Sequence, residues 1–539
     1  MAMQIFLPAW WPLSSVGTLV ASLVTAYIVL HQISIRKHDP REPAILTSTV
    51  PFLGPLLGMA FFGGKYVKSL GLRNRHLPLF TLPVPRSRIY VVTEPGLAAA
   101  VQRASKSLSF TPLIPEATKR ILGLDKATQS IVNRHLDPGP GDEWGFLAEI
   151  QNMVYEWFKS PGNYLEEVTL EAARELNEEV ATFAASGELI QAREEPIDLL
   201  KLVQHFVTVS TARFFYGPRN PIAVDPKLEA AFWDFDHGLG MLLINVFPSF
   251  TAPRAYEGRE QLSAALWKYL EAGHHLKASK IVQKRIEIAL NHGWTLEMIA
   301  REELSFLFAG IVNATTSTFW ILLQIFADPE LLAIVRDELE PLLKSNKSDD
   351  QANTGMKRRI SISDLKEQCP MLVAVYRECL RLGSDNFSTR IVKEDTVLAD
   401  RYFLKKGSAV QIAGGVIHAD QSIWGDNVDN FNPRRFLKNR QSGGARSEKV
   451  HPAAFRAFGG GKTLCPGRHF AMNEILSLVA LIVLQLDMTA PDGDKLYVPQ
   501  KNDSVLPVHV LEPLHPVEVL ICRRRDGFAN SGLNVAFEM

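Results

Sequence analysis

The sequence contains few cysteines and no excess of charge of either sign. Only four cysteines occur in 539 residues, at positions 369, 379, 465 and 522, and no two of them have the CxxC spacing of an ordinary zinc site. The count excludes a disulfide-rich secreted scaffold. Lysine plus arginine number 58, the same as aspartate plus glutamate, so no net field attracts the whole protein to nucleic acid. We expect no nucleic-acid partner.

The composition is that of a compact folded protein. Hydrophobic residues make up 46% and charged residues 22% of the chain, which excludes a disordered or collagen-like protein. Internal repeats and low-complexity blocks are absent beyond about residue 45. Helical periodicity dominates residues 143–185, 228–290 and 295–343, whereas residues 87–92 and 408–412 alternate as strands do. We therefore predict one continuous, mainly α domain with small β-sheets.

An apolar segment lies near the N-terminus. Residues 13–35 contain no Asp, Glu, Lys or Arg, and a stretch of about 20 apolar residues is enough to span a bilayer core. Arg36, Lys37 and Arg41 follow the segment and no basic residue precedes it, so the positive-inside rule places the rest of the chain in the cytosol. A cleaved signal peptide is the alternative, but a basic n-region and a small-residue cleavage site are missing. We predict a single-pass membrane anchor at residues 1–36 and an extended, proline-rich linker at residues 37–58.

The longest predicted helix covers residues 300–328. At 1.5 Å per residue it measures roughly 43 Å, and it is apolar on most faces. We expect it to pass through the middle of the domain. A second transmembrane span is the alternative, but Asn313, Gln324 and several hydroxyl residues disfavour it.

The most informative segment is FGGGKTLCPGRHFA, residues 458–471. Its three consecutive glycines allow the backbone to approach a flat ligand closely. We predict that Cys465 begins an amphipathic helix, with Pro466 at the first helical position. The helix dipole and free N–H groups are then expected to lower the thiol pKa and to donate to sulfur. A thiolate held in this way can ligate haem iron; a buried structural cysteine is the alternative.

The segment resembles the haem-binding loop of the cytochrome P450 superfamily, F-x-x-G-x-x-x-C-x-G. Two more elements of that family precede it in the family order. Residues 378–381, ECLR, resemble the ExxR helix, and residues 431–436, FNPRRF, resemble the PxRF element. The resemblance extends over nearly the whole chain, including the N-terminal anchor, and is to microsomal members of fungal character.

The resemblance implies a haem b cofactor with Cys465 as the axial ligand of its iron. Arg390 is expected to pair with a haem propionate, with a surface salt bridge as the alternative. Thr463 occupies a position where the family usually has Arg or His, and the usual Trp-x-x-x-Arg helix is not found between residues 116 and 145; Lys462 is expected to substitute. The remaining residues implied to contact the cofactor are Phe458, Gly461 and Gly467.

The other two motifs are implied to have structural roles. Glu378 is expected to form a buried ion pair with Arg381 and Arg435 that locks the cysteine loop behind the haem. Residues 171–174 also read ExxR, and only the order and spacing relative to the cysteine loop select the second copy.

The long helix departs from the family pattern. The family usually has an acid and an alcohol after Ala-Gly-x, a pair that manages protons during oxygen activation, but here Val312 and Asn313 follow residues 309–311. Asparagine forms hydrogen bonds but does not donate a proton as an acid. Thr316 lies one turn further on, and its hydroxyl either contributes to proton delivery or bonds back to the helix backbone. We expect Asn313, Thr316 and Cys465 to be the catalytic residues.

This pattern resembles the branch of sterol 7α-hydroxylase and prostacyclin synthase, which contains both hydroxylases and an isomerase. Residues carried over by position as the substrate pocket are Phe308, Ala309, Val312, Phe387 and Val505. Because most are apolar, we expect a large lipophilic substrate, a terpenoid or a steroid in secondary metabolism.

Together these features predict a monooxygenase whose catalytic domain, residues 59–539, faces the cytosol from the endoplasmic reticulum membrane. Electrons are expected from NADPH through NADPH-cytochrome P450 reductase, with cytochrome b5 as an optional second donor. The polar residues 438–449 form a solvated loop or help to dock such a partner. Two alternatives remain: a haem-thiolate isomerase or dehydratase that needs no redox partner, and a non-catalytic haem- or lipid-binding membrane protein.

Overall fold

The computed structural model describes residues 39–48, 50, 52–345, 357–437, 450–524 and 534–539, with two single positions at 22 and 25. The predicted anchor at residues 1–36, those two positions apart, and the polar loop at residues 438–449 lie outside the described residues. The rest folds as a mainly helical body with small sheets, which confirms the predicted fold class.

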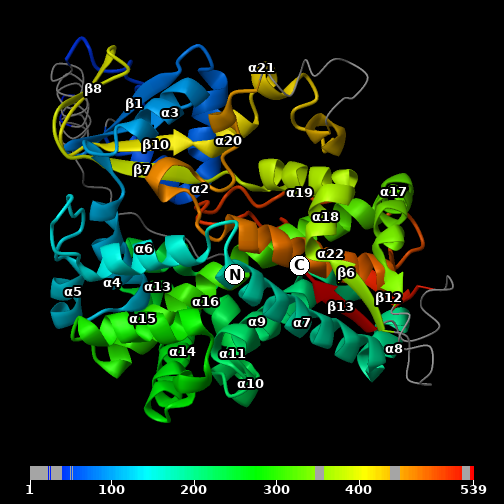
Figure 1. Cartoon of the computed structure of the whole chain (residues 1–539). Coiled ribbons are helices and arrows are strands. Elements are labelled where there is room, and N and C mark those ends of the chain that lie inside the picture. The colour runs from blue at the N-terminus through cyan, green and yellow to red at the C-terminus, as the bar shows by residue number, and fades with distance from the viewer. Residues whose placement is uncertain are drawn as a thin grey trace, which may run out of the picture.

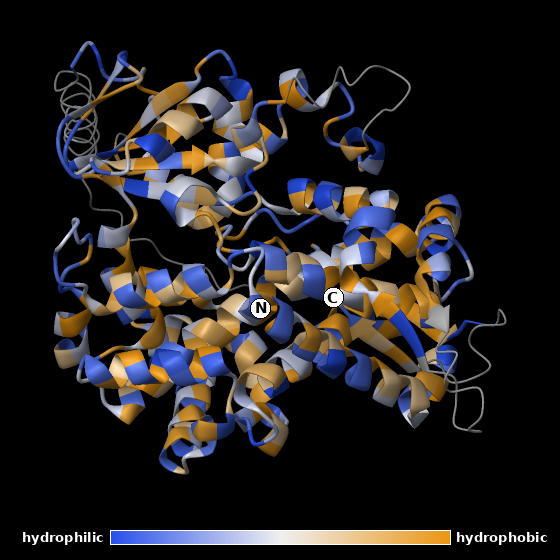
Figure 2. Ribbon diagram, viewed as in Figure 1, coloured by the Kyte–Doolittle hydropathy of each residue, from blue (hydrophilic) through white to orange (hydrophobic). Residues whose placement is uncertain are grey.

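The helices of the N-terminal half are mostly short and amphipathic. Figure 2 shows hydrophobic and hydrophilic bands alternating along many of them, as expected for helices with one buried face. They are α2 (Gly54–Arg73), α3 (Pro95–Arg103), α4 (Ile114–Leu122), α5 (Lys126–Val132), α6 (Phe146–Trp157), α7 (Asn163–Ala185), α8 (Gly187–Glu194), α9 (Leu199–Tyr216), α10 (Pro221–Val224), α11 (Lys227–His237), α12 (Leu239–Ile244), α13 (Pro248–Thr251), α14 (Pro253–Glu271) and α15 (Lys280–Asn291).

The C-terminal half contains the central helices. They are α16 (Leu296–Phe326), α17 (Pro329–Leu339), α18 (Ile362–Gln368), α19 (Pro370–Gly383), α20 (Gly414–His418), α21 (Gln421–Trp424) and α22 (Arg468–Gln485). Several long helical predictions are divided in the structure. Prolines at 248, 253 and 329 lie in the first turns of new helices, because proline suits a helix start but not its interior.

Two helices, α16 and α22, are long and apolar enough to cross a membrane, but this rests on length and composition alone. In α16, 72% of the most apolar window is buried inside the protein, and in α22 78%. Both are therefore core helices. The Thr295 hydroxyl caps α16 by accepting from the Met298 N–H at 3.3 Å.

Thirteen strands are assigned in the described part of the chain. They are β1 (Leu79–Val84), β2 (Ser87–Val92), β3 (Leu108–Ser109), β4 (Ile197–Asp198), β5 (Lys344–Ser345), β6 (Lys357–Ser361), β7 (Phe387–Val392), β8 (Thr396–Leu398), β9 (Tyr402–Leu404), β10 (Ala409–Ala413), β11 (Leu486–Thr489), β12 (Glu518–Arg523) and β13 (Asn534–Glu538). The largest sheet has the order β1-β2-β10-β7-β3, in which β10 is parallel to β2 and antiparallel to β7.

The sheet lies beside α3 and α20 at the top of Figure 1, and helices α4 to α15 fill the lower half. Helix α22 lies between these two parts and packs on α7 and α16. This arrangement brings segments far apart in the sequence to the centre of the molecule, where the predicted functional residues are found.

The predicted linker is partly helical. Residues 40–42 form a turn, and Ile45 forms a bridge with Thr81 of β1, but α2 begins at Gly54 with Pro55 in its first turn. The expectation of an extended chain up to residue 58 is therefore wrong for its last five positions, because proline at a helix start fixes a helical φ.

Candidate active site

Cys465 lies in a closed loop that ends just before α22. Its backbone N–H donates to the carbonyl of Phe458 at 2.9 Å, which joins the two ends of the loop. Gly459 and Gly461 have φ values of +73° and +63°, which residues with a side chain rarely adopt. Cys465 itself is only partly buried, so the loop leaves part of the cysteine accessible.

Helix α22 differs from its prediction in two respects. It begins at Arg468 with Gly467 as its N-cap, so Pro466 precedes the helix and Cys465 lies three residues before its first turn. The helix is also not amphipathic, since every residue from Asn473 to Gln485 is buried. A helix in the middle of a large core buries all its faces, and its apolar residues then have no informative period.

The thiol of Cys465 does not have the lowered pKa that the sequence suggested. Burial raises the pKa of Cys465, while the backbone N–H of Gly467 and the charge of Arg468 act in the opposite direction without reversing it. The donor to sulfur is present as expected. A thiolate at this position therefore depends on a bound cation, since the chain alone does not stabilise the negative charge sufficiently.

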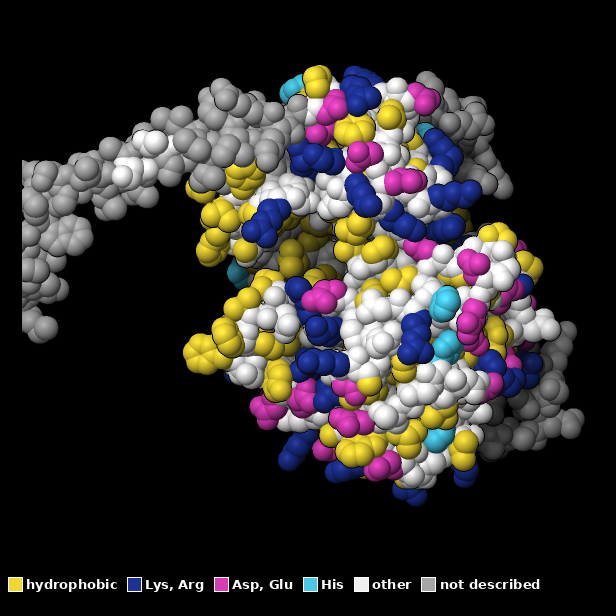
Figure 3. All heavy atoms as spheres, turned by 90° about the vertical axis from the view of Figure 1, so that its left-hand side faces the viewer, with side chains coloured by type: hydrophobic (Ala, Val, Ile, Leu, Met, Phe, Trp, Pro, Cys, Tyr) yellow, Lys and Arg dark blue, Asp and Glu magenta, His cyan; other side chains and the backbone are white. Residues whose placement is uncertain are grey.

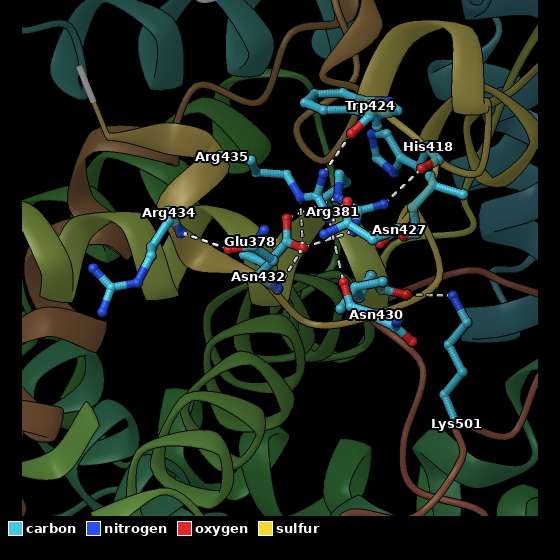
Figure 4. Close-up of polar contacts among 12 residues, drawn as sticks. Glu378, Arg381, His418, Trp424, Asn427, Asn430, Asn432, Arg434, Arg435 and Lys501 are labelled. Atoms are coloured by element: carbon cyan, nitrogen blue, oxygen red, sulfur yellow. Dashed lines mark hydrogen bonds and ion pairs between the residues drawn. The ribbon is translucent and has the colours of Figure 1, made fainter. Parts of the chain in front are cut away.

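Glu378 is at the centre of a buried ionic network, shown in Figure 4. Its carboxylate accepts from Arg381 at 2.7 and 2.8 Å and from Nε of Arg435 at 2.9 Å. The side chain of Glu378 is 0% exposed and that of Arg381 1%. Arg381 also donates to the carbonyls of His418 and Val428. One carboxylate thus fixes α19, α20 and the segment before the cysteine loop.

The other ExxR copy is on the surface. Arg174 lies 3.4 Å from Glu171, and their side chains are 60% and 46% exposed. The same four-residue pattern therefore forms a solvated ion pair in α7 and a buried network in α19. The two copies of the motif differ in their burial.

Two buried arginines face the cysteine loop without an acidic partner in the described part of the chain. Arg390 donates to the Thr389 carbonyl at 2.7 Å and to the Thr463 hydroxyl. Arg456, which the sequence analysis missed, is 2% exposed, and the amide oxygen of Gln102 accepts from it at 2.9 Å. Burial, and then the charge of Arg390, lower the pKa of Arg456 to about 10.

Arg456 has a sequence signal that was overlooked. It is a lone charge in the apolar run AAFRAF directly before the glycines. Its backbone N–H donates to Nε2 of His418 at 2.8 Å, and the other ring nitrogen of His418 bonds to the Ser384 carbonyl at 3.0 Å. Burial lowers the pKa of His418 to about 3, so this histidine is a neutral link between the glycine loop and the Glu378 network.

A cavity of about 920 Å³ lies beside the loop and is lined by Arg390, Gly461, Lys462, Thr463 and Tyr155, among others. Helix α6 supplies Tyr155, whose hydroxyl donates to the Lys462 carbonyl at 2.9 Å. Thus a helix lies close to the loop just after residues 116–145, which lack the Trp-x-x-x-Arg pattern, and a tyrosine of that helix bonds the loop backbone.

The predicted catalytic face of α16 contains two exposed positions on an otherwise buried segment. Ala309 and Asn313, one turn apart, are exposed, whereas Val312 and Thr316 are fully buried and Phe308 is half-buried. The Thr316 hydroxyl donates to the Val312 carbonyl at 3.2 Å, which is the backbone bond considered as the alternative. Its hydroxyl is therefore not presented to the space that Ala309 and Asn313 face.

The other two predicted pocket residues lie on separate elements. Phe387 is half-buried at the start of β7. Val505 is 43% exposed in the segment before β12, and its carbonyl accepts from Gly64 of α2 at 3.0 Å. The same segment reaches α16 at Val510, whose N–H donates to Oδ1 of Asn313 at 3.0 Å.

These residues fit haem b. The partly exposed Cys465 is a ligand of the type that haem iron accepts. The unpaired Arg390 and Arg456 supply buried positive charge, which needs anions such as the two propionates of haem. At Gly460 an added Cβ would lie 2.1 Å from the Gln102 amide, so a side chain there would displace the group that accepts from Arg456.

Comparisons with known proteins agree with this geometry. A model of the cytochrome P450 family matches residues 43–512. Cytochrome P450 monooxygenase nodJ of Hypoxylon pulicicidum is 31% identical over 493 residues, which are 90% of this chain and 91% of the relative. Cholesterol 7-alpha-monooxygenase of Cricetulus griseus is 27% identical over 294 residues, 51% of this chain and 56% of the relative.

The fold is also shared with a solved structure. The crystal structure of cytochrome P450DA heme domain matches with a TM-score of 0.64 and 14% identity, over 90% of this chain and 99% of that chain. At this identity the match shows the fold alone. Since the family model spans most of the chain and a relative above 30% identity covers nearly all of it, this protein belongs to the cytochrome P450 family of haem b monooxygenases.

Proposed function

We propose that this enzyme inserts one oxygen atom of O2 into an unactivated C–H bond of a terpenoid or steroid, with electrons from NADPH through NADPH-cytochrome P450 reductase. The observation that carries the proposal is the partly exposed Cys465 on its glycine loop, with two unpaired buried arginines beside it. When bound, haem b supplies the redox chemistry, in which O2, two electrons and two protons yield a hydroxylated product and water.

These residues would hold the cofactor. Cys465 would ligate the iron, and Phe458, Gly461 and Gly467 would shape the loop around it. Arg390 and Arg456 would hold the propionates. Because Lys462 is exposed on the loop, it contributes charge at the outer edge of this site.

The Glu378 network positions the loop without taking part in the reaction. Arg381 and Arg435 share its carboxylate and donate to backbone carbonyls of the segment that leads to the loop. Charged hydrogen bonds of this kind hold a backbone more firmly than neutral ones. We therefore assign these three residues to structural support.

Asn313 is the residue that orients water for proton delivery. Its Oδ1 accepts from Val510, and its amide NH2 group forms no hydrogen bond within the described part of the chain, so its donors face the exposed side of α16. The amide orients water but does not itself release a proton. Since Thr316 bonds back to its own helix, its hydroxyl takes part only after a rotamer change.

The substrate proposal rests on the apolar lining and on a relative. Phe308 and Ala309 offer no charge to a ligand, Phe387 and Val505 are also apolar, and Val312 is fully buried behind them. The relative from Cricetulus griseus acts, by its name, on cholesterol, which supports a steroid or a similarly shaped terpenoid.

We also propose an endoplasmic reticulum location, with residues 1–36 as anchor, 37–58 as linker and 59–539 as the catalytic domain facing the cytosol. Exposed apolar residues support membrane contact. Figure 3 shows apolar side chains along one edge of the molecule, above and below a hollow. Large exposed hydrophobic residues in and before α2, and around α12 and α13, are Leu53, Leu56, Leu57, Phe61, Phe62, Val246, Phe247 and Phe250.

The second candidate function is a haem-thiolate isomerase or dehydratase that needs neither NADPH nor a redox partner. The observation that favours it is Asn313 in place of an acid, together with the back-bonded Thr316 hydroxyl. The third interpretation, a non-catalytic binding protein, disagrees with relatives that are named monooxygenases.

The test is deletion of the gene in its own host, with mutant and parent grown under 18O2. The monooxygenase proposal expects a precursor to accumulate that is lighter than the missing product by one labelled oxygen. The accumulated precursor is then incubated with purified enzyme, reductase and NADPH, with and without cytochrome b5. Conversion without NADPH, or a mass difference of zero or of one water, would instead establish the isomerase or dehydratase.

A further inference from the structure

Two histidines and two acids meet where the end of α11 touches the segment before β12. His237 Nε2 lies 3.3 and 3.2 Å from the two carboxylate oxygens of Glu512. His509 Nε2 lies 3.5 Å from Oδ1 of Asp236. One potential ligand atom from each of Asp236, His237 and Glu512 lies within 4.8 Å of the other two.

Asp236 is the unusual member of this cluster. Its side chain is 0% exposed, and neither carboxylate oxygen accepts a hydrogen bond within the described part of the chain. A buried carboxylate without donors is costly unless a cation lies beside it, so this side chain points to a missing positive partner.

The ring of His509 is oriented as in metal-binding histidines. Its Nδ1 bonds to the backbone carbonyl of Val510 at 2.8 Å, so Nδ1 carries the proton, and in the neutral ring Nε2 carries a lone pair directed at Asp236. A hydrogen bond from the second nitrogen to a carbonyl is the usual arrangement that fixes the tautomer of a metal ligand. A lone pair and a carboxylate facing each other at this distance need a cation or a proton between them.

The spacing also suits a metal. In a tetrahedral zinc site with bonds of 2.0 to 2.1 Å, the ligand atoms lie about 3.3 Å apart, close to the separations of both histidine and carboxylate pairs. We propose that Asp236, His237 and Glu512 form a binding site for a divalent transition-metal ion of the Zn²⁺ class, with His509 in the outer shell against Asp236. Imidazole and carboxylate ligands are the set that Zn²⁺ accepts.

The site would join two elements that border the active site. Asp236 and His237 end α11, whereas His509 and Glu512 belong to the segment that also binds Asn313 through the Val510 N–H. A bound ion would fix this segment against α11 and so restrict its motion beside α16. The His237 side chain is 51% exposed, which leaves the ion a path from solvent.

The test uses the haem-loaded enzyme prepared without a polyhistidine tag, stripped with EDTA and titrated with ZnCl2. Calorimetry and elemental analysis after dialysis are expected to give one Zn²⁺ per chain. His237→Ala, His509→Ala and Asp236→Asn are each expected to weaken binding at least about tenfold. The matched control is His205→Ala, which removes a comparable surface pair, since His205 Nδ1 lies 3.0 Å from Glu229.

A second measurement does not depend on the variants. Hydrogen exchange of residues 230–237 and 503–512 in the unaltered enzyme is expected to slow by at least about threefold when ZnCl2 is added. No Zn²⁺ bound to the unaltered enzyme, equal affinity in the His237→Ala variant, or an equal loss in the His205→Ala control overturns the proposal. So does unchanged exchange in both segments.

Discussion

The side-chain oxygen of Asn313 accepts a hydrogen bond from the backbone N–H of Val510 at 3.0 Å. This bond joins α16 to a segment 197 residues further along the chain. The asparagine therefore has two tasks: its oxygen holds the segment, and its amide donors face the exposed side of the helix. An ionised carboxylate at this position would keep only the acceptor, whereas an amide offers an acceptor and two N–H donors at once.

Asn313→Ala is expected to slow turnover and to lower the amount of product formed per NADPH oxidised. Loss of one such hydrogen bond costs about 1 kcal/mol, or roughly fivefold in rate if the bond acts only in the reaction. Substrate affinity, measured from the shift in the haem absorption band, should change less. Asn313→Asp keeps the acceptor for Val510, so it should retain the position of the segment. An unchanged rate in Asn313→Ala would remove Asn313 from the mechanism.

Cys465→Ala is expected to abolish activity and the thiolate-type absorption of the carbon monoxide complex, because the sulfur ligand is gone. Cys522→Ala is the matched control, since Cys522 is also partly buried but lies in β12. The control should keep both properties. A thiolate-type spectrum in Cys465→Ala would refute the ligand assignment.

Glu378→Gln is expected to lower the free energy of unfolding by about 3 to 5 kcal/mol, because it leaves Arg381 and Arg435 with unpaired charge in the core. Denaturant unfolding monitored by circular dichroism measures the change. Glu171→Gln alters the surface copy of the motif and should cost less than about 0.5 kcal/mol. Equal effects of the two substitutions would contradict the burial argument.

Arg456→Leu is expected to reduce the fraction of enzyme that retains haem during gel filtration, since one of the two unpaired buried cations is lost. Haem content per chain, measured as the pyridine complex, gives the readout without any activity assay. Arg434→Leu removes a neighbouring arginine whose side chain is 62% exposed, and should leave haem content unchanged. Full retention of haem by Arg456→Leu would mean that Arg456 serves the packing of the protein and does not hold the cofactor.

Acid is expected to destabilise the enzyme through His418. The pKa of this histidine falls from 6.5 to about 3 on burial, so between these values the unfolded chain binds a proton that the folded chain excludes. The stability contributed by the neutral ring is complete above pH 6.5 and decreases as the pH falls towards 3, by up to about 1.4 kcal/mol per pH unit. In His418→Gln the free energy of unfolding, measured with denaturant, should depend less steeply on pH. The change in slope should correspond to about one proton fewer taken up on unfolding. An equal slope in both proteins would exclude His418 as the source.

Sequence reasoning found the features whose signals are local. The apolar run of α16, the glycine loop and the ExxR spacing all lie within short stretches, and the structure has each of them in place. It missed the contact between Arg456 and His418, because 38 residues separate the two along the chain, although the lone charge of Arg456 in an apolar run was a local signal. The pKa of Cys465 was misjudged for the same reason, since its burial depends on the whole fold.

Much of the attachment of the segment from Asp503 to Leu511 runs through its own backbone, beside the side-chain contacts of Asp503 with Lys65 and of His509 with Asp236. The carbonyl of Val505 accepts from Gly64, the N–H of Leu511 donates to Gly383, and the carbonyl of Leu511 accepts from the Trp320 indole at 2.9 Å. Even Asn313 binds a main-chain N–H rather than a side chain. Substitutions along this segment, except at Asp503 and His509, can therefore alter the wall next to α16 while the backbone attachments persist. Evolution towards a new substrate can therefore replace side chains on this surface without breaking the backbone hydrogen bonds that hold the segment in place.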